Sequence, residues 1–345
     1  MRILFASTQG AGHVGPLLPF ARAALAAGHT VLLAAPVPRS ELPWARLDLA
    51  PGRAAAWAPV FTPQSPGLVH TLQELFIGLD AAAALPGMLA AVERFAPDLI
   101  VRETCEFASA VAAERSGVPT VQVGIHLDTT IDTGEALLAI ADPALRRLGL
   151  GEPERLLHAP VLTLVPPSLS ADSPRLHRFR TETPPPRERD LVYVSFGSET
   201  PRTPHFPRLY RDTIEALDGD VLVALGRDPA DLGPVPGNVR VERWVDQPAA
   251  LARATAMVGH GGSGSTLAAL AAGVPLAFIP LFVDGHDNAR RVCAAGAGRL
   301  VEGDLTTVVP RLDAGAAQEI ADEIAALPPV SAWATQAPLG HAAGL

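Results

Sequence analysis

The sequence contains no lysine, and each of its 27 basic residues is an arginine. Enzymes that form a Schiff base with a substrate or with pyridoxal phosphate need a primary amine, and so do the phosphate-binding loops of P-loop nucleotide hydrolases. These chemistries are therefore excluded. Any phosphate group bound by this chain must be held by backbone amides, histidines, hydroxyl groups or arginines.

Cysteines and long apolar runs are also scarce. Cys105 and Cys293 are the two cysteines and form no C-x-x-C pair, so the sequence offers neither a disulfide framework nor a metal site. The first strand starts at Arg2 without a signal peptide, and Gly273 and Pro280 interrupt the most apolar later stretch. We expect a cytoplasmic protein that binds no metal and does not cross a membrane.

Acidic residues outnumber basic ones by 36 to 27, which gives a formal net charge of −9. No cluster of basic residues is longer than a pair, so the chain lacks the basic surface that nucleic-acid binding requires. Hydrophobic residues make up 48% of the 345 residues, which is enough for two domains with a core each. We expect small molecules as partners and no nucleic acid, and a homodimer stays open.

Apolar runs of strand length alternate with Ala/Leu-rich helical stretches in two separate series. Strands that are apolar on both faces and separated by helices indicate a parallel sheet covered on both sides. The first series comprises residues 3–6, 17–27, 30–35, 99–101, 107–115 and 120–123, and the second comprises residues 191–195, 206–217, 221–225, 256–258, 266–272 and 276–279. The chain is therefore predicted to be an α/β protein of two halves.

A proline-rich, charged segment at residues 184–190 separates the two series and is predicted to be a linker. It divides the chain into a first domain, residues 1–183, and a second domain, residues 191–345. Residues 39–66 have weak periodicity, and we expect irregular loops there, near a cleft. The residues after Pro328 give no clear signal.

The second half contains a glycine-rich turn between an apolar strand and an Ala-rich helix, with the sequence His260-Gly261-Gly262-Ser263-Gly264-Ser265. Glycines leave no Cβ between a ligand and the backbone N–H groups. A helix starting at about Ser265 adds unpaired amides and the positive end of its dipole. The turn is predicted to bind a diphosphate, with His260 as a further donor. The alternative is a strand-to-helix turn without a ligand, and the motifs on either side of the turn count against it.

Another glycine-rich turn follows the first strand. Gly10, Gly12 and Gly15 match the G-x-G-x-x-G pattern of dinucleotide sites. That pattern also needs an acidic residue at the end of the second strand, and the second strand here ends without one, so a nicotinamide-dinucleotide site is not expected. His13 lies in the same turn, where ligands commonly bind and where an imidazole can accept a proton near neutral pH.

Two segments flank the diphosphate turn, Arg243-Trp244-Val245-Asp246-Gln247-Pro248 before it and residues 280–292 after it. In order and spacing they resemble the GT-B glycosyltransferases that transfer sugars from nucleoside diphosphates to natural products, especially the antibiotic-modifying enzymes of actinobacteria. The resemblance covers residues 2–36 and 191–301. It implies two Rossmann-like, doubly wound parallel-sheet domains facing across a cleft, with the acceptor in the first and the nucleotide sugar in the second.

By the same resemblance, His13 is the general base that deprotonates the acceptor. A base histidine works best beside a carboxylate that fixes its tautomer, and Glu103, at the end of the strand that begins at residue 99, is the candidate. Two alternatives stay open at this point. Arg102 could pair with Glu103 as a plain ion pair, and Glu106 is a competing carboxylate.

The resemblance also implies contacts to the donor in the second half. Trp244 is expected to stack on the pyrimidine base, as the first residue of the family's W-x-x-Q element, in which Gln247 is the last; a core tryptophan is the alternative. Ser198 is expected to meet the diphosphate or the base. Asp284 is expected to accept hydrogen bonds from hydroxyl groups of the donor sugar.

Two departures from the family pattern bear on the identity of the donor. Many UDP-sugar enzymes place a glutamate for the ribose hydroxyls at the position of Ala268, so its absence favours a thymidine diphosphate (TDP) donor, whose ribose has no 2′-hydroxyl. A glutamine often follows the aspartate at the position of Gly285. Its absence removes a contact to a sugar hydroxyl and favours a deoxysugar.

The expected reaction is direct attack of an aglycone hydroxyl on the anomeric carbon of a TDP-sugar, with inversion and without a metal or other cofactor. Asp218-Gly219-Asp220 matches the D-x-D metal motif of a different glycosyltransferase fold, but its place between a helix and a strand predicts a turn. One rival is a nucleotide-sugar 2-epimerase of the same fold, whose acidic catalytic set is missing from the sequence. Another is a non-catalytic nucleotide-sugar-binding helper, which would lack His13.

Overall fold

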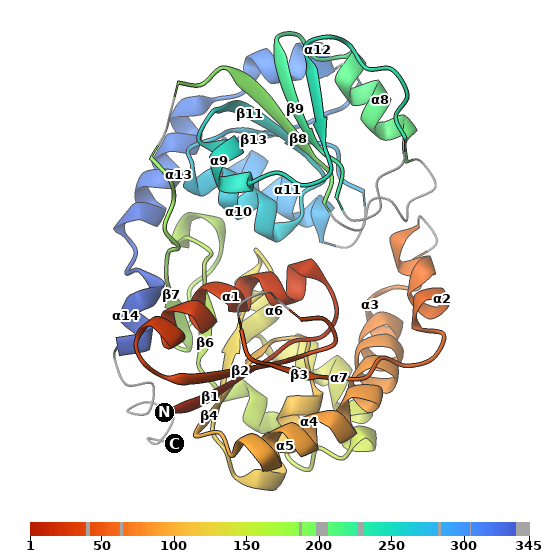
Figure 1. The fold of residues 1–345 in the computed structure, drawn as a ribbon, viewed down its shortest axis with the longest axis vertical. Coiled ribbons are helices and arrows are strands. Elements are labelled where there is room, and N and C mark those ends of the chain that lie inside the picture. The colour runs from red at the N-terminus through yellow and green to blue at the C-terminus, as the bar shows by residue number, and fades with distance from the viewer. Residues whose placement is uncertain are drawn as a thin grey trace.

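In a computed structural model the chain forms two α/β halves, each built on one parallel sheet (Figure 1). The structure describes residues 1–38, 42–62, 65–185, 188–197, 206–226, 231–281, 284–303 and 305–335. The two predicted parallel sheets are confirmed, and they lie on either side of residues 184–190.

The sheet of the first half has seven strands in the order β3-β2-β1-β4-β5-β6-β7. The strand order reverses direction between β1 and β4, and in open α/β sheets ligands bind beside the carboxyl ends of such a pair. The strands are β1 (Arg2–Ala6), β2 (Thr30–Ala35), β3 (Trp44–Arg46), β4 (Leu99–Glu103), β5 (Thr120–Val123), β6 (Val161–Thr163) and β7 (Leu176–Arg178).

Helices connect these strands and bury both faces of the sheet. In β1, Ile3 and Phe5 face one hydrophobic cluster whereas Leu4 and Ala6 face another, and all four are fully buried. The helices are α1 (Ala11–Ala26), α2 (Arg53–Trp57), η1 (Ala58–Phe61), α3 (Leu68–His70), η2 (Thr71–Ala81), α4 (Ala82–Phe95), α5 (Ala108–Ser116), α6 (Thr129–Thr133), α7 (Glu135–Leu148), η3 (Pro153–Leu157) and η4 (Pro167–Leu169).

The sheet of the second half has six strands in the order β10-β9-β8-β11-β12-β13, with its reversal between β8 and β11. The strands are β8 (Leu191–Ser195), β9 (Asp220–Ala224), β10 (Val239–Glu242), β11 (Ala254–Gly259), β12 (Leu276–Phe278) and β13 (Gly298–Leu300). The helices are α8 (Arg208–Glu215), α9 (Gln247–Leu251), α10 (Ser263–Ala271), α11 (Gly285–Ala294), α12 (Leu305–Val308), η6 (Val309–Arg311), α13 (Ala314–Ala326) and α14 (Val330–Thr335). Asp218 and Gly219 lie between α8 and β9, and the positive φ of Gly219, +75°, agrees with the predicted turn.

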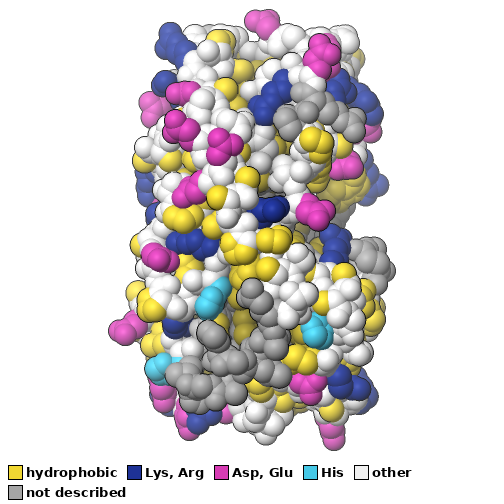
Figure 2. All heavy atoms as spheres, turned by 90° about the vertical axis from the view of Figure 1, so that its left-hand side faces the viewer, with side chains coloured by type: hydrophobic (Ala, Val, Ile, Leu, Met, Phe, Trp, Pro, Cys, Tyr) yellow, Lys and Arg dark blue, Asp and Glu magenta, His cyan; other side chains and the backbone are white. Residues whose placement is uncertain are grey.

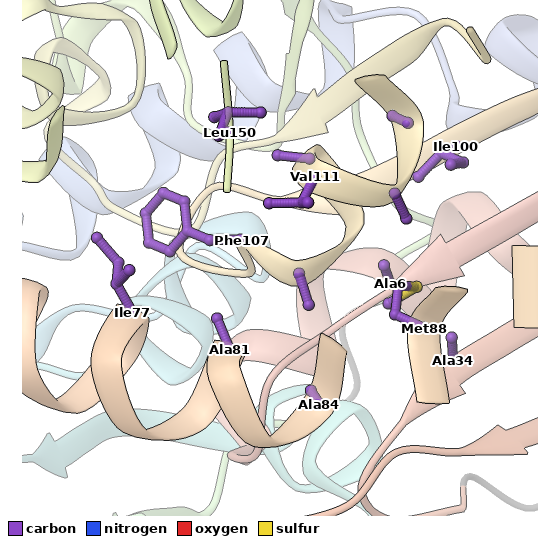
Figure 3. Close-up of a cluster of buried hydrophobic side chains, with 14 of the residues drawn as sticks. Ala6, Ala34, Ile77, Ala81, Ala84, Met88, Ile100, Phe107, Val111 and Leu150 are labelled. Carbon is purple, nitrogen blue, oxygen red and sulfur yellow. The ribbon is translucent and has the colours of Figure 1, made fainter. Parts of the chain in front are cut away.

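One helical segment, Leu68–Phe95, is long and apolar enough to cross a membrane by length and composition alone. A core helix of a soluble protein passes the same test. Ile77, Ala81, Ala84 and Met88 lie along one side of this segment and are buried in the cluster that also holds Phe107 (Figure 3). The apolar composition of the segment is therefore explained by packing within the first half.

The expectation of irregular loops across residues 39–66 is wrong in part. Residues 44–46 add the edge strand β3 to the sheet, with Leu47 N–H donating to Ala35 O. Helix α2 is fixed by a bidentate ion pair from Arg53 to the buried Asp80, at 2.7 and 2.8 Å. A three-residue edge strand and a five-residue helix are too short to produce a periodic pattern, which is why the sequence did not predict them.

The chain returns to the first half at its C-terminal end, so the observed domain division differs from the predicted one there. Helix α14 packs on α1, and Trp333, 6% exposed, lies edge-on to Phe5 and Phe20 with ring centroids 6.3 and 5.5 Å apart. The chain passes between the halves twice, once after Arg180 and once before α14. These two crossings are hydrogen-bonded to each other, since Arg180 N–H donates to Pro328 O and Val330 N–H donates to Arg180 O. Residues 330–335 therefore belong to the core of the first half.

The side of the molecule that carries these crossings faces the viewer in Figure 2. Among the described residues drawn there, arginine and acidic side chains are interspersed rather than gathered by sign. This face shows no extended basic patch in the part of the chain that the structure describes.

Replacing Trp333 with alanine is expected to lower the free energy of unfolding by about 3–5 kcal/mol, because it leaves a cavity against Phe5 and Phe20. Trp244→Ala is the matched control, since that side chain is 61% exposed and its loss should cost less than about 0.5 kcal/mol. Urea unfolding followed by circular dichroism measures both. Equal midpoints for Trp333→Ala and the unmodified chain would contradict the assignment of α14 to the first core.

Candidate functional site

The structure brings the predicted base and its carboxylate together. His13 lies in the first turn of α1, after β1, and Glu103 ends β4, so the two residues flank the reversal point of the first sheet. The distance from His13 Nδ1 to Glu103 Oε1 is 3.2 Å. The His13 side chain is 20% exposed, whereas that of Glu103 is fully buried.

Glu103 is built to stay ionised. Its Oε2 accepts a 2.7 Å hydrogen bond from Cys105 N–H, and its Oε1 also accepts from Thr8 N–H at 3.3 Å. Burial opposes ionisation, but His13, the Cys105 amide and Arg102 together outweigh it, so the pKa of Glu103 lies below its ordinary value. A buried carboxylate of this kind orients the imidazole and favours its protonated form once it takes a proton.

The two alternatives for Glu103 are both accounted for by other contacts. The Arg102 guanidinium donates to backbone oxygens of Thr104 and Glu106 and to Gln122 Oε1, at 3.1 Å in the last case. The Glu106 carboxylate accepts from the N–H groups of Ala108 and Ser109 at the start of α5. Glu103 is therefore the carboxylate that contacts His13. The catalytic roles of the two residues remain predictions.

The glycine-rich turn of the second half lies at the other reversal point, between β11 and α10. The helix begins at Ser263, two residues earlier than expected, and its first backbone hydrogen bond runs from Thr266 N–H to Gly262 O. The N–H groups of Ser263, Gly264 and Ser265 therefore have no acceptor inside the helix. These amides form a positively polarised helix end, which is the kind of site that binds a diphosphate.

The glycines of this turn differ in what surrounds them. A Cβ on Gly261, whose φ is +88°, would lie 2.4 Å from Gly285 O, and a Cβ on Gly285 would lie 2.5 Å from His260 O. A Cβ on Gly262 would lie 2.6 Å from His260 Nε2, whereas a Cβ on Gly264 would meet no atom within 4 Å. Backbone packing thus requires Gly261 and Gly285 to be glycine, whereas a Cβ on Gly262 would meet the His260 ring. No contact within the described residues requires glycine at position 264, so a bound ligand is the remaining reason for it.

The His260 ring is half-buried between two glycines. A Cβ on Gly197, which follows β8, would lie 2.7 Å from His260 Cε1, so the ring rests against the backbone on that side as well. Burial lowers the pKa of His260 to about 4, outweighing the nearby Asp284 and a backbone contact with Ser195. The imidazole is therefore neutral at physiological pH and carries one N–H. Its predicted role as a phosphate donor is untested.

Asp284 is held at the N-terminus of α11 by two side chains. Its Oδ2 accepts from Ser263 Oγ and from Asn288 Nδ2, both at 2.8 Å. Asn288 is buried and also donates to Gly261 O at 2.8 Å, so it ties α11 to the glycine-rich turn. Asn288 was not among the predicted site residues. Its spacing of four residues from Asp284, one helical turn, is the signal in the sequence that identifies it.

The W-x-x-Q element contributes one contact and one exposed side chain. Gln247, the first residue of α9, donates from Nε2 to Ser265 Oγ at 3.2 Å and so reaches the start of α10. Asp246 caps α9 by accepting from Ala249 N–H at 3.2 Å. Trp244 is 61% exposed, which excludes a core tryptophan and leaves its face accessible for stacking. Ser198, the remaining predicted contact, lies outside the described residues.

The structure contains a second histidine–carboxylate pair that the sequence did not reveal. His126 lies in the loop after β5, and its Nδ1 is 2.7 Å from Oδ1 of Asp132 in α6. The next residues of that loop contact the second half: Leu127 is fully buried in its core, and Asp128 Oδ2 accepts from Arg291 Nη2 of α11 at 2.5 Å. Residues that follow the carboxyl ends of the first sheet therefore meet the helix that carries Asp284.

Comparison with known proteins agrees with this geometry. The family model described as "Erythromycin biosynthesis protein CIII-like, C-terminal domain" matches residues 208–329. The L-demethylnoviosyl transferase of Streptomyces niveus is 33% identical, over 86% of this chain and 84% of that protein.

Two solved structures match along nearly the whole chain. The glycosyltransferase SnogD of Streptomyces nogalater has a TM-score of 0.78 at 28% identity, covering 97% of this chain and 98% of that one. The glycosyltransferase SsfS6 of Streptomyces sp. SF2575, complexed with thymidine diphosphate, has a TM-score of 0.76 at 25% identity, with the same coverage. The chain therefore belongs to the GT-B-fold glycosyltransferases of actinobacterial natural-product biosynthesis.

Proposed function

We propose that this glycosyltransferase moves a deoxysugar from a TDP-sugar to a hydroxyl group of a natural-product aglycone, with inversion at the anomeric carbon. The observation that carries the proposal is the 3.2 Å contact of His13 with the buried Glu103, at the reversal point of the first sheet. A base in the first half and a diphosphate-binding turn in the second suit direct displacement, in which nucleophile and leaving group lie on opposite sides of the reacting carbon.

In the proposed reaction His13 takes the proton of the acceptor hydroxyl, and Glu103 stabilises the resulting imidazolium. The acceptor oxygen attacks the anomeric carbon as the bond to the diphosphate breaks. The amides of Ser263, Gly264 and Ser265 and the neutral His260 take up the charge that develops on the leaving TDP. These groups make a metal unnecessary in the proposed mechanism.

The proposed preference for a TDP-deoxysugar rests on two positions, Ala268 and Gly285, that lack the polar side chains found in many UDP-sugar enzymes. Ala268 lies on α10, and its methyl group cannot bind a ribose diol. SsfS6, which holds thymidine diphosphate, supports a TDP donor for this chain. Gly285 has a packing reason to be glycine, because a Cβ there would collide with His260 O. It still leaves the protein without a side chain that could bind a sugar hydroxyl at this position, which favours a deoxysugar donor.

On the sugar itself, Asp284 is the proposed contact. Its Oδ2 is occupied by Ser263 and Asn288. Its Oδ1 forms no hydrogen bond with the described residues and is the atom that would accept from a sugar hydroxyl.

His13→Ala is expected to lower kcat by about a hundredfold or more while leaving TDP affinity nearly unchanged, since it removes the base and not the donor site. Glu103→Gln should cause a smaller loss, because the histidine remains but loses its charged partner. Transfer from a TDP-sugar to a panel of aromatic polyketide hydroxyls, followed by chromatography, gives kcat, and calorimetry gives the TDP affinity. An undiminished kcat for His13→Ala would remove His13 from the mechanism.

TDP is expected to bind more tightly than UDP, and Ala268→Glu should narrow or reverse that preference by offering a carboxylate to the ribose diol. Ala268→Leu is the matched control, because it fills the same space without a carboxylate. Calorimetry with both nucleotides tests the idea. UDP binding at least as tightly as TDP to the unmodified chain would refute the argument from Ala268.

Substitutions in the glycine-rich turn are expected to separate ligand contact from protein packing. Gly264→Ala adds a Cβ that meets no protein atom, so a loss of TDP affinity without a change in Tm would report the ligand alone. Gly237→Ala, at an exposed position that is equally open, is the control and should leave TDP affinity unchanged. Gly262→Val should abolish binding, and His260→Ala should weaken it by about 1.5–3 kcal/mol. Unchanged affinity in all three turn variants would place the diphosphate elsewhere.

A further inference from the structure

The His126–Asp132 pair has no part in the proposed mechanism. Like the His13–Glu103 pair, it joins a partly exposed histidine to a fully buried carboxylate. The Asp132 carboxylate is fully buried and accepts three hydrogen bonds, from His126 Nδ1 at 2.7 Å, from His126 N–H at 3.3 Å and from Thr104 Oγ1 at 2.7 Å. A Cβ on Gly124 would lie 2.6 Å from Asp132 Oδ2, so this glycine makes room for the carboxylate.

The two pairs lie side by side at the same edge of the first sheet. β4 and β5 are adjacent and parallel, with Glu103 opposite Val123. Glu103 contacts His13, and the next residue, Thr104, contacts Asp132, so consecutive residues of one chain segment hold the two pairs. His126 therefore belongs to the same edge of the first sheet as the base, and it lies within electrostatic reach of Asp284 of the second half.

His126 presents one open nitrogen. Because Nδ1 faces Asp132, the remaining donor is Nε2, which forms no hydrogen bond with the residues that the structure describes, and the side chain is 19% exposed. The charged groups that act on it are Asp132 of α6, Asp284 of α11 and Glu103 of β4. All three are carboxylates.

These carboxylates decide the protonation state. Burial alone would lower the pKa of His126, but Asp132, with Asp284 and Glu103, outweighs burial and raises it to about 9. At neutral pH the imidazole is therefore a cation that donates from Nε2 and cannot accept a proton. This protonation state favours a fixed positive charge at this edge of the first sheet over a second base.

We propose that His126 binds an anionic oxygen of the acceptor, a carboxylate or a phenolate, that lies beside the hydroxyl group deprotonated by His13. The assignment rests on the proposed function for the location of the acceptor. The donor diphosphate is the less suited ligand, because the proposed function assigns it to His260 and to the amides at the start of α10 in the second half, whereas His126 belongs to the first half. The enzyme would thus select acceptors that carry an acidic group next to the reacting hydroxyl.

The test compares salicylate with 2-hydroxybenzyl alcohol, which share a ring and a phenolic hydroxyl but differ in the charge of the neighbouring group. A second pair, 4-nitrophenol and 4-nitroanisole, is compared at pH 8, where the phenol is ionised, and tests a phenolate in place of a carboxylate. Binding is followed by NMR titration of the full chain, with and without saturating TDP, using the imidazole nitrogen signals of His126. We expect each anion to bind about tenfold or more tightly than its neutral partner and to shift those signals.

Two variants and a control assign that selectivity. In His126→Gln the ratio of affinities should fall to about one, whereas His158→Gln, at an exposed histidine of the same half, should keep it. Asp132→Asn removes the charge that contributes most to raising the pKa of His126. At pH 8 this variant should therefore also lose its preference for the anionic ligand. In the unmodified chain the selectivity for salicylate should hold from pH 6 to 8 and decline as the pH rises past about 9, because the cation exists below its pKa and is lost above it. Thermal melting confirms that each variant is folded.

Each other outcome counts against the proposal. Selectivity that survives in His126→Gln, or that is absent from the unmodified chain, would overturn it. A loss of TDP affinity in His126→Gln would assign the cation to the diphosphate instead. If the unmodified chain bound no TDP, the proposed function would fail, yet the titration without TDP would still report on His126.

Discussion

The second half depends on one place where two backbones touch without side chains between them. The turn at His260 and Gly261 rests directly on Gly285, and neither glycine can carry a Cβ without a contact of 2.4 to 2.5 Å. This contact brings the N-termini of α10 and α11 together. Asn288 then bridges them by donating to Gly261 O and to Asp284, so the unpaired amides and the carboxylate lie in one small region.

Helix α11 also connects the two halves of the site. Asp284 lies at its N-terminus, and two turns later Arg291 donates to Asp128 and to Leu169 O of the first half. Asp128 follows His126 by two residues. The position of the proposed sugar contact and the position of the His126 cation are therefore set by the same rigid element.

Much of the fold follows from the sequence because parallel strands buried on both faces leave a clear apolar pattern. Strands β2, β5 and β8 have the predicted bounds, and the turn at 260–265 is marked by its glycines. The pairing of His13 with Glu103, 90 residues away, came from the family resemblance, since no periodicity links positions so distant. The physical requirement for Gly261 and Gly285 was not visible, because it arises from a contact between two turns.

Other features escaped prediction for local reasons. Helix α10 begins at Ser263 because Thr266 N–H bonds to Gly262 O, and the serines on both sides of Gly264 are equally plausible first residues by type. The His126–Asp132 pair leaves no signal of its own. A histidine and an aspartate six residues apart are common in sequences, and only the burial of Asp132 against Gly124 and Thr104 distinguishes this pair.

The return of the chain at Trp333 has a mechanical consequence. The second half is attached to the first by two covalent crossings, and hydrogen bonds between Arg180 and residues 328–330 join those crossings side by side. A domain on a single tether can swivel about it, but one on two joined strands can only bend about an axis that runs across both. Two joined crossings therefore restrain twisting between the halves more strongly than one tether would, which favours a constant alignment of the amides of α10 with His13.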